Sequence, residues 1–95
     1  MAFYMAYTKH LRLFGHVQGV FFRESFAQKA GELGITGWIR NLSDGSLEAT
    51  IQGTEANIDE MIKWARSGPE LALVTRIEIT EGSGQFNDFK RLQTL

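Results

Sequence analysis

The chain of 95 residues contains no cysteine and only one proline. Without cysteine it can form no disulfide, no thiolate metal site and no cysteine nucleophile. Its two histidines, His10 and His16, are not spaced with carboxylates in the way that metal ligands usually are. We therefore expect a protein that holds no metal and needs no cofactor.

An excess of one charge and a long apolar run are also missing. Ten Lys and Arg residues face eleven Asp and Glu residues, for a net charge of -1, whereas nucleic-acid modules usually have a basic excess. No run of about 18 apolar residues is present. The opening MAFYMAY lacks the charged region and the length of a signal peptide. We expect no nucleic-acid partner, no membrane span and a cytoplasmic location.

The length favours one compact domain over residues 1–95, with residues 1–7 as a loosely held leader. A domain of this size buries only roughly 60–68% of the surface that its unfolded chain exposes. It therefore has room for one core and for a shallow site made largely of loops. We expect it to act as a monomer.

Apolar spacing predicts the secondary structure. Alternating residues such as Leu11 and Leu13 are typical of strands, and apolar residues at intervals of three and four are typical of helices. Strands are predicted over 9–14, 35–41, 47–52, 74–80 and 86–92, with helices over 22–33 and between Thr54 and Ser67. This order predicts an α+β, ferredoxin-like two-layer sandwich: β-α-β-β-α-β with a short extra C-terminal strand, and an antiparallel sheet covered on one face by two helices.

A glycine-bracketed loop between the first strand and the first helix is the strongest candidate for a binding site. Successive backbone N–H groups in such a turn can converge on an anion, and the start of a helix adds further donors. The residues expected to bind phosphate are Gly15, His16, Val17, Gln18, Gly19, Val20 and Arg23. Arg23 is unfavourable in a first helical turn unless an anion joins it. From the pattern alone, a plain strand-to-helix connection with a solvated Arg23 fits equally well.

The run GHVQGVFFR, which ends at Arg23, resembles the acylphosphatase signature. GWIRN followed by SDGSLEATIQG resembles the second signature of that family. The run SGPELALV resembles a stretch that comes later in the same family. The resemblance covers about residues 9 to 90. It implies hydrolysis of small acyl phosphates to a carboxylate and inorganic phosphate without metal or cofactor, phosphate being both product and competitor. It also implies that Arg23 and Asn41 are catalytic: Arg23 binds the phosphate, and Asn41 orients the attacking water.

The chemistry of an acyl phosphate requires few protein groups. Its leaving group is a carboxylate with a pKa of roughly 4 to 5, so no general acid is needed. The loose transition state of phosphoryl transfer makes a strong base of little use. What remains is to hold the phosphate, neutralise its charge and place one water in line. By itself, Asn41 at a strand end before a turn would more often be structural.

Two alternatives come from other classes of protein. RNA-recognition domains share this order of elements, but they place stacking aromatics on strands, whereas FFRESF falls on the first helix. A regulatory sensor would bind phosphate without turnover. The larger aromatic residues are expected in the core or half-buried: Phe21, Phe22, Phe26, Trp38 and Trp64. Arg40, beside Asn41, is expected on a solvated face from which it could add positive potential near the substrate.

Overall fold

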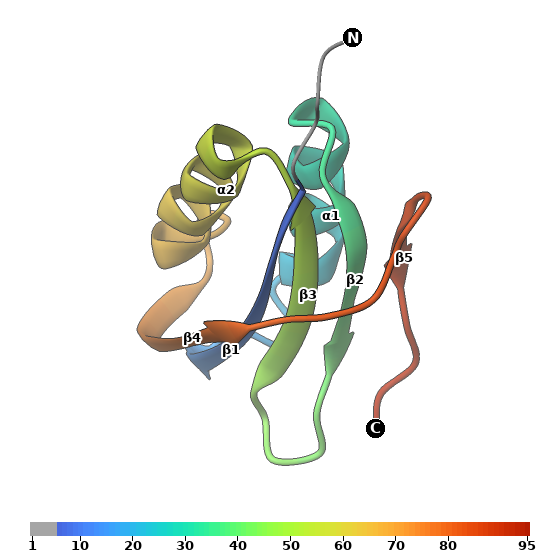
Figure 1. Ribbon diagram of the computed structural model, residues 1–95. Coiled ribbons are helices and arrows are strands. Elements are labelled where there is room, and N and C mark those ends of the chain that lie inside the picture. The colour runs from blue at the N-terminus through green and yellow to red at the C-terminus, as the bar shows by residue number, and fades with distance from the viewer. Residues whose placement is uncertain (1–5) are drawn as a thin grey trace, which may run out of the picture.

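Residues 6–95 of the chain are described by the computed structural model, and they form five strands and two helices (Figure 1). The strands are β1 (Tyr7–His16), β2 (Thr36–Asn41), β3 (Leu47–Gly53), β4 (Leu73–Glu81) and β5 (Phe89–Arg91), and the helices are α1 (Phe22–Glu32) and α2 (Glu55–Ser67). The leader expected over residues 1–7 falls mainly on residues 1–5, which lie outside the described residues. Tyr7 already belongs to β1, where it pairs with Gly53.

The five strands make one sheet in the order β4-β1-β3-β2-β5. The pairs β1–β3, β1–β4 and β2–β3 are antiparallel, as predicted, but β5 runs parallel to β2. The sheet is therefore mixed, and the expectation of a wholly antiparallel sheet was wrong for β5. The reason is the connection after β4, which carries the chain across the sheet to its opposite edge before β5 begins (Figure 1).

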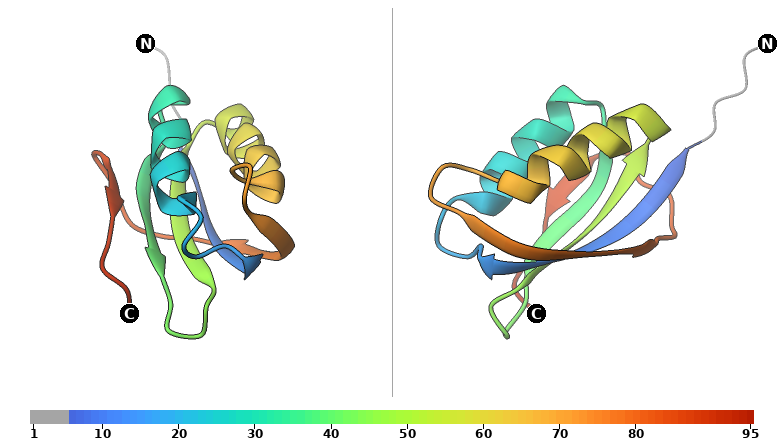
Figure 2. Two further views of the ribbon diagram at one scale, coloured as in Figure 1. Left: turned by 180° about the vertical axis from the view of Figure 1, so that it is seen from behind. Right: turned by 90° about the vertical axis from the view of Figure 1, so that its left-hand side faces the viewer.

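Both helices cover the same face of the sheet, and the other face is left without helices (Figure 2). Strand alternation explains this layer, because Leu11 and Leu13 of β1 are fully buried while Arg12 between them is only half-buried. The helices bury the predicted apolar stripes, with Phe22, Phe26 and Ala30 from α1 and Ile58, Met61 and Ala65 from α2. Neither helix of the described chain is long and apolar enough to cross a membrane.

The ends of the helices follow the signals in the sequence. Thr54 is the N-cap of α2, where its side-chain oxygen accepts a hydrogen bond from the backbone N–H of Asn57 at 3.2 Å. Gly34, just after α1, has a φ of 66°, the left-handed conformation that glycine adopts without a steric penalty. These local residues fix where each helix begins or ends.

Phe21 differs from the expectation that it lies in the core or half-buried. Its side chain is 77% exposed, while its neighbour Phe22 is 1% exposed. Phe21 is the N-cap of α1 and has a φ of 61°, the only positive φ among the non-glycine residues described. This left-handed turn sends the ring outward, an effect that an apolar pattern does not reveal.

Candidate active site

The first strand runs further than predicted, so the loop after it begins later. β1 continues through Gly15 to His16, with a register shift between Phe14 and Gly15. Gly15 has a φ of 123°, and a Cβ atom there would lie 2.1 Å from the carbonyl oxygen of Leu73 in β4. Gly15 is thus needed for the close approach of β4. His16 is exposed at the end of the strand.

Two valines anchor the loop that follows. The side chains of Val17 and Val20 are only 1% and 5% exposed, and both belong to the core. Because these side chains point inward, the loop can offer a ligand only its backbone at those positions. Gly19 and Phe21 have φ values of 74° and 61°, and such left-handed residues turn successive N–H groups toward one side, as in an anion-binding nest.

Gln18 ties this loop to the connection between β2 and β3. Its Nε2 donates hydrogen bonds to the carbonyl oxygens of Leu42 at 2.8 Å and Ser46 at 2.9 Å. Leu42 directly follows Asn41, the last residue of β2. The Gln18 side chain is therefore committed to positioning the loop against Asn41, and it leaves only its backbone for an anion.

The β2–β3 connection is itself held by Asp44. The Asp44 carboxylate accepts hydrogen bonds from the backbone N–H of Ser46 at 2.9 Å and from the Ser46 hydroxyl at 2.5 Å, and it pairs with Arg12. The bonds from Ser46, helped by Arg12, lower the pKa of Asp44 below its ordinary value of 3.8. The hydrogen bonds that hold this turn next to Asn41 thus favour the ionised form of Asp44.

The start of α1 faces the same region. The N-cap, Phe21, provides no side-chain hydrogen bond to the first turn, so the first backbone N–H groups of the helix remain available to a ligand. Arg23 is the second residue of α1. Among the hydrogen bonds and ion pairs of residues 6–95, none engages the Arg23 guanidinium, whereas the adjacent Glu24 is paired with Arg91.

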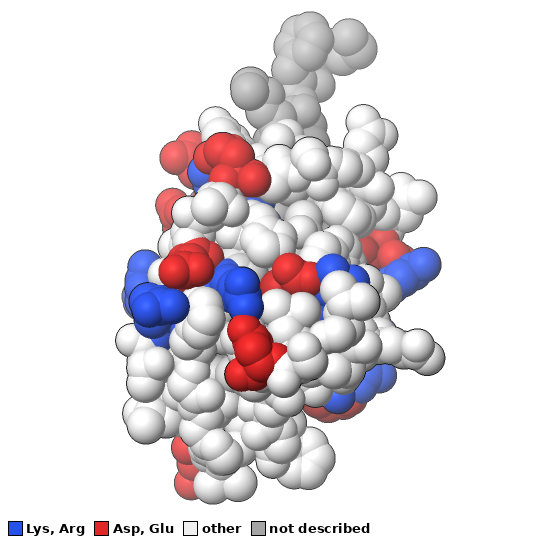
Figure 3. All heavy atoms as spheres, turned by 90° about the horizontal axis from the view of Figure 1, so that it is seen from below, with Lys and Arg blue, Asp and Glu red and all other residues white. Residues whose placement is uncertain are grey.

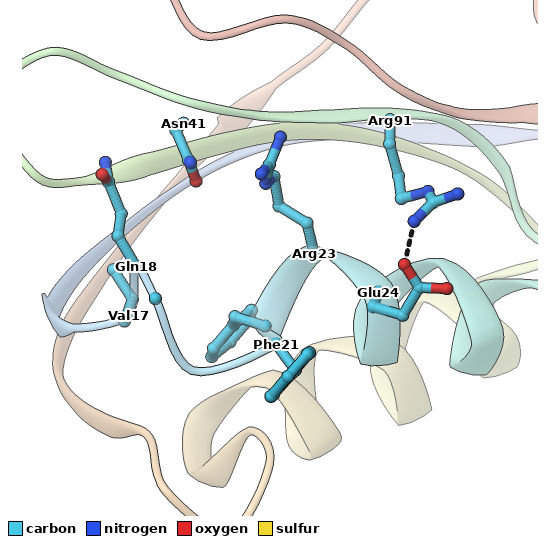
Figure 4. Close-up of a pocket in the computed structure, with 9 residues that line it drawn as sticks. Val17, Gln18, Phe21, Arg23, Glu24, Asn41 and Arg91 are labelled. Carbon is cyan, nitrogen blue, oxygen red and sulfur yellow. Dashed lines mark hydrogen bonds and ion pairs between the residues drawn. The ribbon is translucent and has the colours of Figure 1, made fainter.

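These elements enclose a pocket of about 580 Å³ (Figure 4). It is lined by Val17, Gln18, Gly19, Phe21, Phe22, Arg23, Glu24, Asn41 and Arg91. In Figure 4 the side chains of Arg23 and Asn41 extend toward each other from α1 and from the end of β2. The pocket thus brings together five of the predicted site residues, whereas Gly15, His16 and Val20 are not part of its lining.

Comparison with known proteins gives the family. The sequence profile of the acylphosphatases matches residues 9–91. The chain belongs to the acylphosphatase family. It is 45% identical to the acylphosphatase of Thiobacillus denitrificans over 84 residues, which is 88% of this chain and 94% of that relative. The acylphosphatase of Thermococcus kodakarensis is 51% identical over 70 residues, 74% of this chain and 77% of the relative.

A solved acylphosphatase confirms the predicted fold. The structure of an acylphosphatase from Coxiella burnetii superimposes with a TM-score of 0.88 at 38% identity, over 92% of this chain and 93% of that one. The prediction of a ferredoxin-like hydrolase of acyl phosphates is therefore confirmed at the level of fold, family and activity.

In this acylphosphatase, sequence reasoning missed four of the residues that line the pocket: Phe21, Phe22, Glu24 and Arg91. The first three adjoin the recognised motif or lie in it. Arg91 comes from β5 and pairs with Ile39 of β2. Phe89 and Arg91 are two positions apart in a strand, so the sequence indicates that both side chains lie on the same face of the sheet. It is the pairing of β5 with β2 that places Arg91 at the pocket.

Arg40 is not part of the pocket lining. It lies on the sheet face without helices, where it pairs with Glu48 and stands over the Trp38 ring with Cζ 4.9 Å from the ring centroid. Strand alternation puts Arg40 and Asn41 on opposite faces. On the face of the molecule seen in Figure 3, basic and acidic side chains are likewise interspersed, so that face has no continuous basic surface.

Proposed function

We propose that this acylphosphatase hydrolyses small acyl phosphates by in-line attack of water on phosphorus, with Arg23 binding the phosphate and Asn41 orienting the water, and that it does so without a metal ion. The observation that carries the proposal is the arrangement of Arg23 and Asn41 in one pocket, where the Arg23 guanidinium engages no other described residue. A guanidinium presents a planar fork that suits two phosphate oxygens.

Phosphate binding would combine Arg23 with backbone donors. The N–H groups of the 17–21 loop and of the first turn of α1 lie next to the pocket, and both kinds of donor favour a negatively charged ligand. These donors are fixed by the buried side chains of Val17 and Val20. They would therefore be in place before the substrate arrives, which is the condition for effective stabilisation of charge in a transition state.

Asn41 would place the nucleophile. Its side-chain oxygen can accept a hydrogen bond from water, which leaves a lone pair of the water oxygen directed at phosphorus. As the new P–O bond forms, the anhydride P–O bond breaks and its electron pair leaves with the carboxylate. The water proton passes to solvent or to the phosphate, and the products are a carboxylate and inorganic phosphate. Phosphate would also compete with the substrate, because it presents the same tetrahedral group.

The rival function is a sensor that binds phosphate without turnover. Catalytic turnover separates the two, since a sensor would bind an acyl phosphate and release it unchanged.

The proposal is tested by hydrolysis of benzoyl phosphate in ¹⁸O-labelled water with EDTA present. We expect turnover with one ¹⁸O atom in each phosphate released, because water attacks phosphorus, and competitive inhibition by inorganic phosphate. Mass spectrometry of both products locates the label. Label found in benzoate would mean attack on the acyl carbon, and a strict need for added metal would overturn the metal-independent mechanism.

A further inference from the structure

The pocket contains a second guanidinium, which the proposed phosphate chemistry does not use. Arg91 is the last residue of β5. Two residues earlier, Phe89 packs against Phe26 of α1, with ring centroids 5.6 Å apart. Since strand residues two apart share a face, Arg91 also projects to the α1 side of the sheet. There it lines the pocket and pairs with Glu24 in the first turn of α1.

The Glu24–Arg91 pair is only weakly held. Its side chains are 62% and 50% exposed, and ion pairs at such sites contribute little to stability. Another anion that enters the pocket could therefore replace the Glu24 carboxylate at Arg91 at small cost. Arg23, by contrast, is expected to be taken by the phosphate itself.

The direction of attack indicates where the acyl group lies. In an in-line displacement the leaving group is opposite the attacking water, so water held by Asn41 would direct the acyl group away from Asn41. In Figure 4, Glu24 and Arg91 stand beyond Arg23 as seen from Asn41. The acyl group would thus leave toward the part of the pocket that contains this pair.

We infer that Arg91 is a specificity-determining residue that binds a second anionic group on the acyl part of the substrate, in competition with Glu24; this inference rests on the proposed function of the same pocket. The substrates favoured are acyl phosphates whose acyl group bears a carboxylate or a further phosphate. Arg91 can bind either group through two parallel hydrogen bonds. Glu24 repels the same group, so it moderates the preference.

The test compares 3- and 4-carboxybenzoyl phosphate with 4-methylbenzoyl phosphate, which has a similar size but no second charge. The rigid ring prevents attack of the carboxylate on the anhydride. Arg91→Gln should lower kcat/KM for at least one carboxylated substrate about threefold to fivefold, as for one half-exposed ion pair. The change should lie in KM, because the contact is made equally in ground and transition states. Glu24→Gln should raise the same kcat/KM about twofold to fivefold.

Lys90→Gln is the matched control, since Lys90 neighbours Arg91 but alternates to the other side of β5 and is absent from the pocket lining. Lys90→Gln should leave unchanged the ratio of kcat/KM for the carboxylated substrates to kcat/KM for the methylated one. The inference is overturned if Arg91→Gln leaves that ratio unchanged because kcat/KM is either unaffected or lowered equally for all substrates. It is also overturned if Lys90→Gln lowers the ratio as much as Arg91→Gln does. A fall in the ratio for Glu24→Gln would overturn the competition. Absence of turnover for every substrate in the unmodified protein would instead contradict the proposed function.

Discussion

A cation at the positive end of a helix is the most informative single residue of this chain. Arg23 lies in the first turn of α1, where a positive side chain is unfavourable by about 0.3–1 kcal/mol. No ion pair among residues 6–95 offsets this cost. The phosphate that we propose as its ligand would offset this cost, so removal of Arg23 should separate activity from stability.

Arg23→Gln should lower kcat/KM by a factor that corresponds to a loss of at least about 3–4 kcal/mol of transition-state stabilisation, the cost of a lost oxyanion donor. It should also abolish competition by phosphate. The free energy of unfolding should stay the same or rise by about 0.3–1 kcal/mol. Benzoyl phosphate kinetics and urea unfolding check both. Arg66→Gln, in the last turn of α2, serves as the control and should keep full activity. Near-normal turnover of Arg23→Gln would refute the assignment of the phosphate site.

Asn41→Ala should lower kcat about a hundredfold, because the attacking water is no longer placed in line. The inhibition constant of inorganic phosphate should change little, since Asn41 is assigned to water and not to the anion. Steady-state kinetics with and without phosphate measure both quantities. A parallel loss of phosphate binding would assign Asn41 to the anion instead.

Phe21 combines a left-handed backbone with an exposed ring, so glycine at this position should be more stable than alanine, the reverse of the usual order. At an ordinary position glycine is less stable than alanine by about 0.5–1 kcal/mol, but at a φ of 61° the Cβ atom itself is unfavourable by roughly 1–2 kcal/mol. Phe21→Gly should therefore have a free energy of unfolding about 0.5–1 kcal/mol above that of Phe21→Ala. Chemical denaturation of the pair measures this difference, and the usual order would show that residue 21 is not left-handed in solution.

At the scale of elements, the pocket depends on how the 17–21 loop is joined to the β2–β3 connection. This contact is made by the Gln18 side chain, which donates to Leu42 and Ser46. Each element has a clear local signal, but the link between them joins residues 24 and 28 positions apart. The register of β2 with β3 decides whether the β2–β3 connection lies within reach of the 17–21 loop.

Gln18→Ala should lower the free energy of unfolding by about 1–2 kcal/mol, the net contribution of two hydrogen bonds. It should also lower kcat roughly tenfold, because Asn41 loses the support that positions it. Denaturation and acetyl phosphate turnover test these effects. Gln28→Ala, exposed on α1, is the control; equal kinetics for both variants would show that Gln18 has no positioning role.

At the scale of the whole molecule, one aromatic cluster joins both helices and the edge strand. Phe26 is fully buried, and its ring lies 6.3, 6.0 and 5.6 Å from those of Phe22, Trp64 and Phe89. Because α1, α2 and β5 all meet there, the cluster sets the distance between the elements that frame the pocket.

Phe26→Ala should lower the free energy of unfolding by about 3–5 kcal/mol, as for other large-to-small core substitutions. Domains of this kind are stable by about 5–15 kcal/mol, so a large share of the stability would be lost. Thermal and urea unfolding measure the change. Phe21→Ala, whose ring is exposed, should cost far less, and similar losses for the two variants would contradict the assigned core.

Features that depend on neighbouring residues could be predicted from the amino-acid sequence alone. Apolar periodicity defined the strands and helices, the Thr54 cap and Gly34 marked helix ends, and the glycine loop with Arg23 marked the site that we propose for the phosphate. Each of these signals arises within a few residues, because backbone conformation and side-chain direction repeat over short distances.

Which distant groups share the pocket became clear from the folded structure. It turned Phe21 outward, assigned Gly15 to the approach of β4, set β5 parallel to β2 and so brought Arg91 to Glu24. Strand direction and ion-pair partners depend on the path of the connections and on packing between segments far apart in the chain, and no local pattern records them.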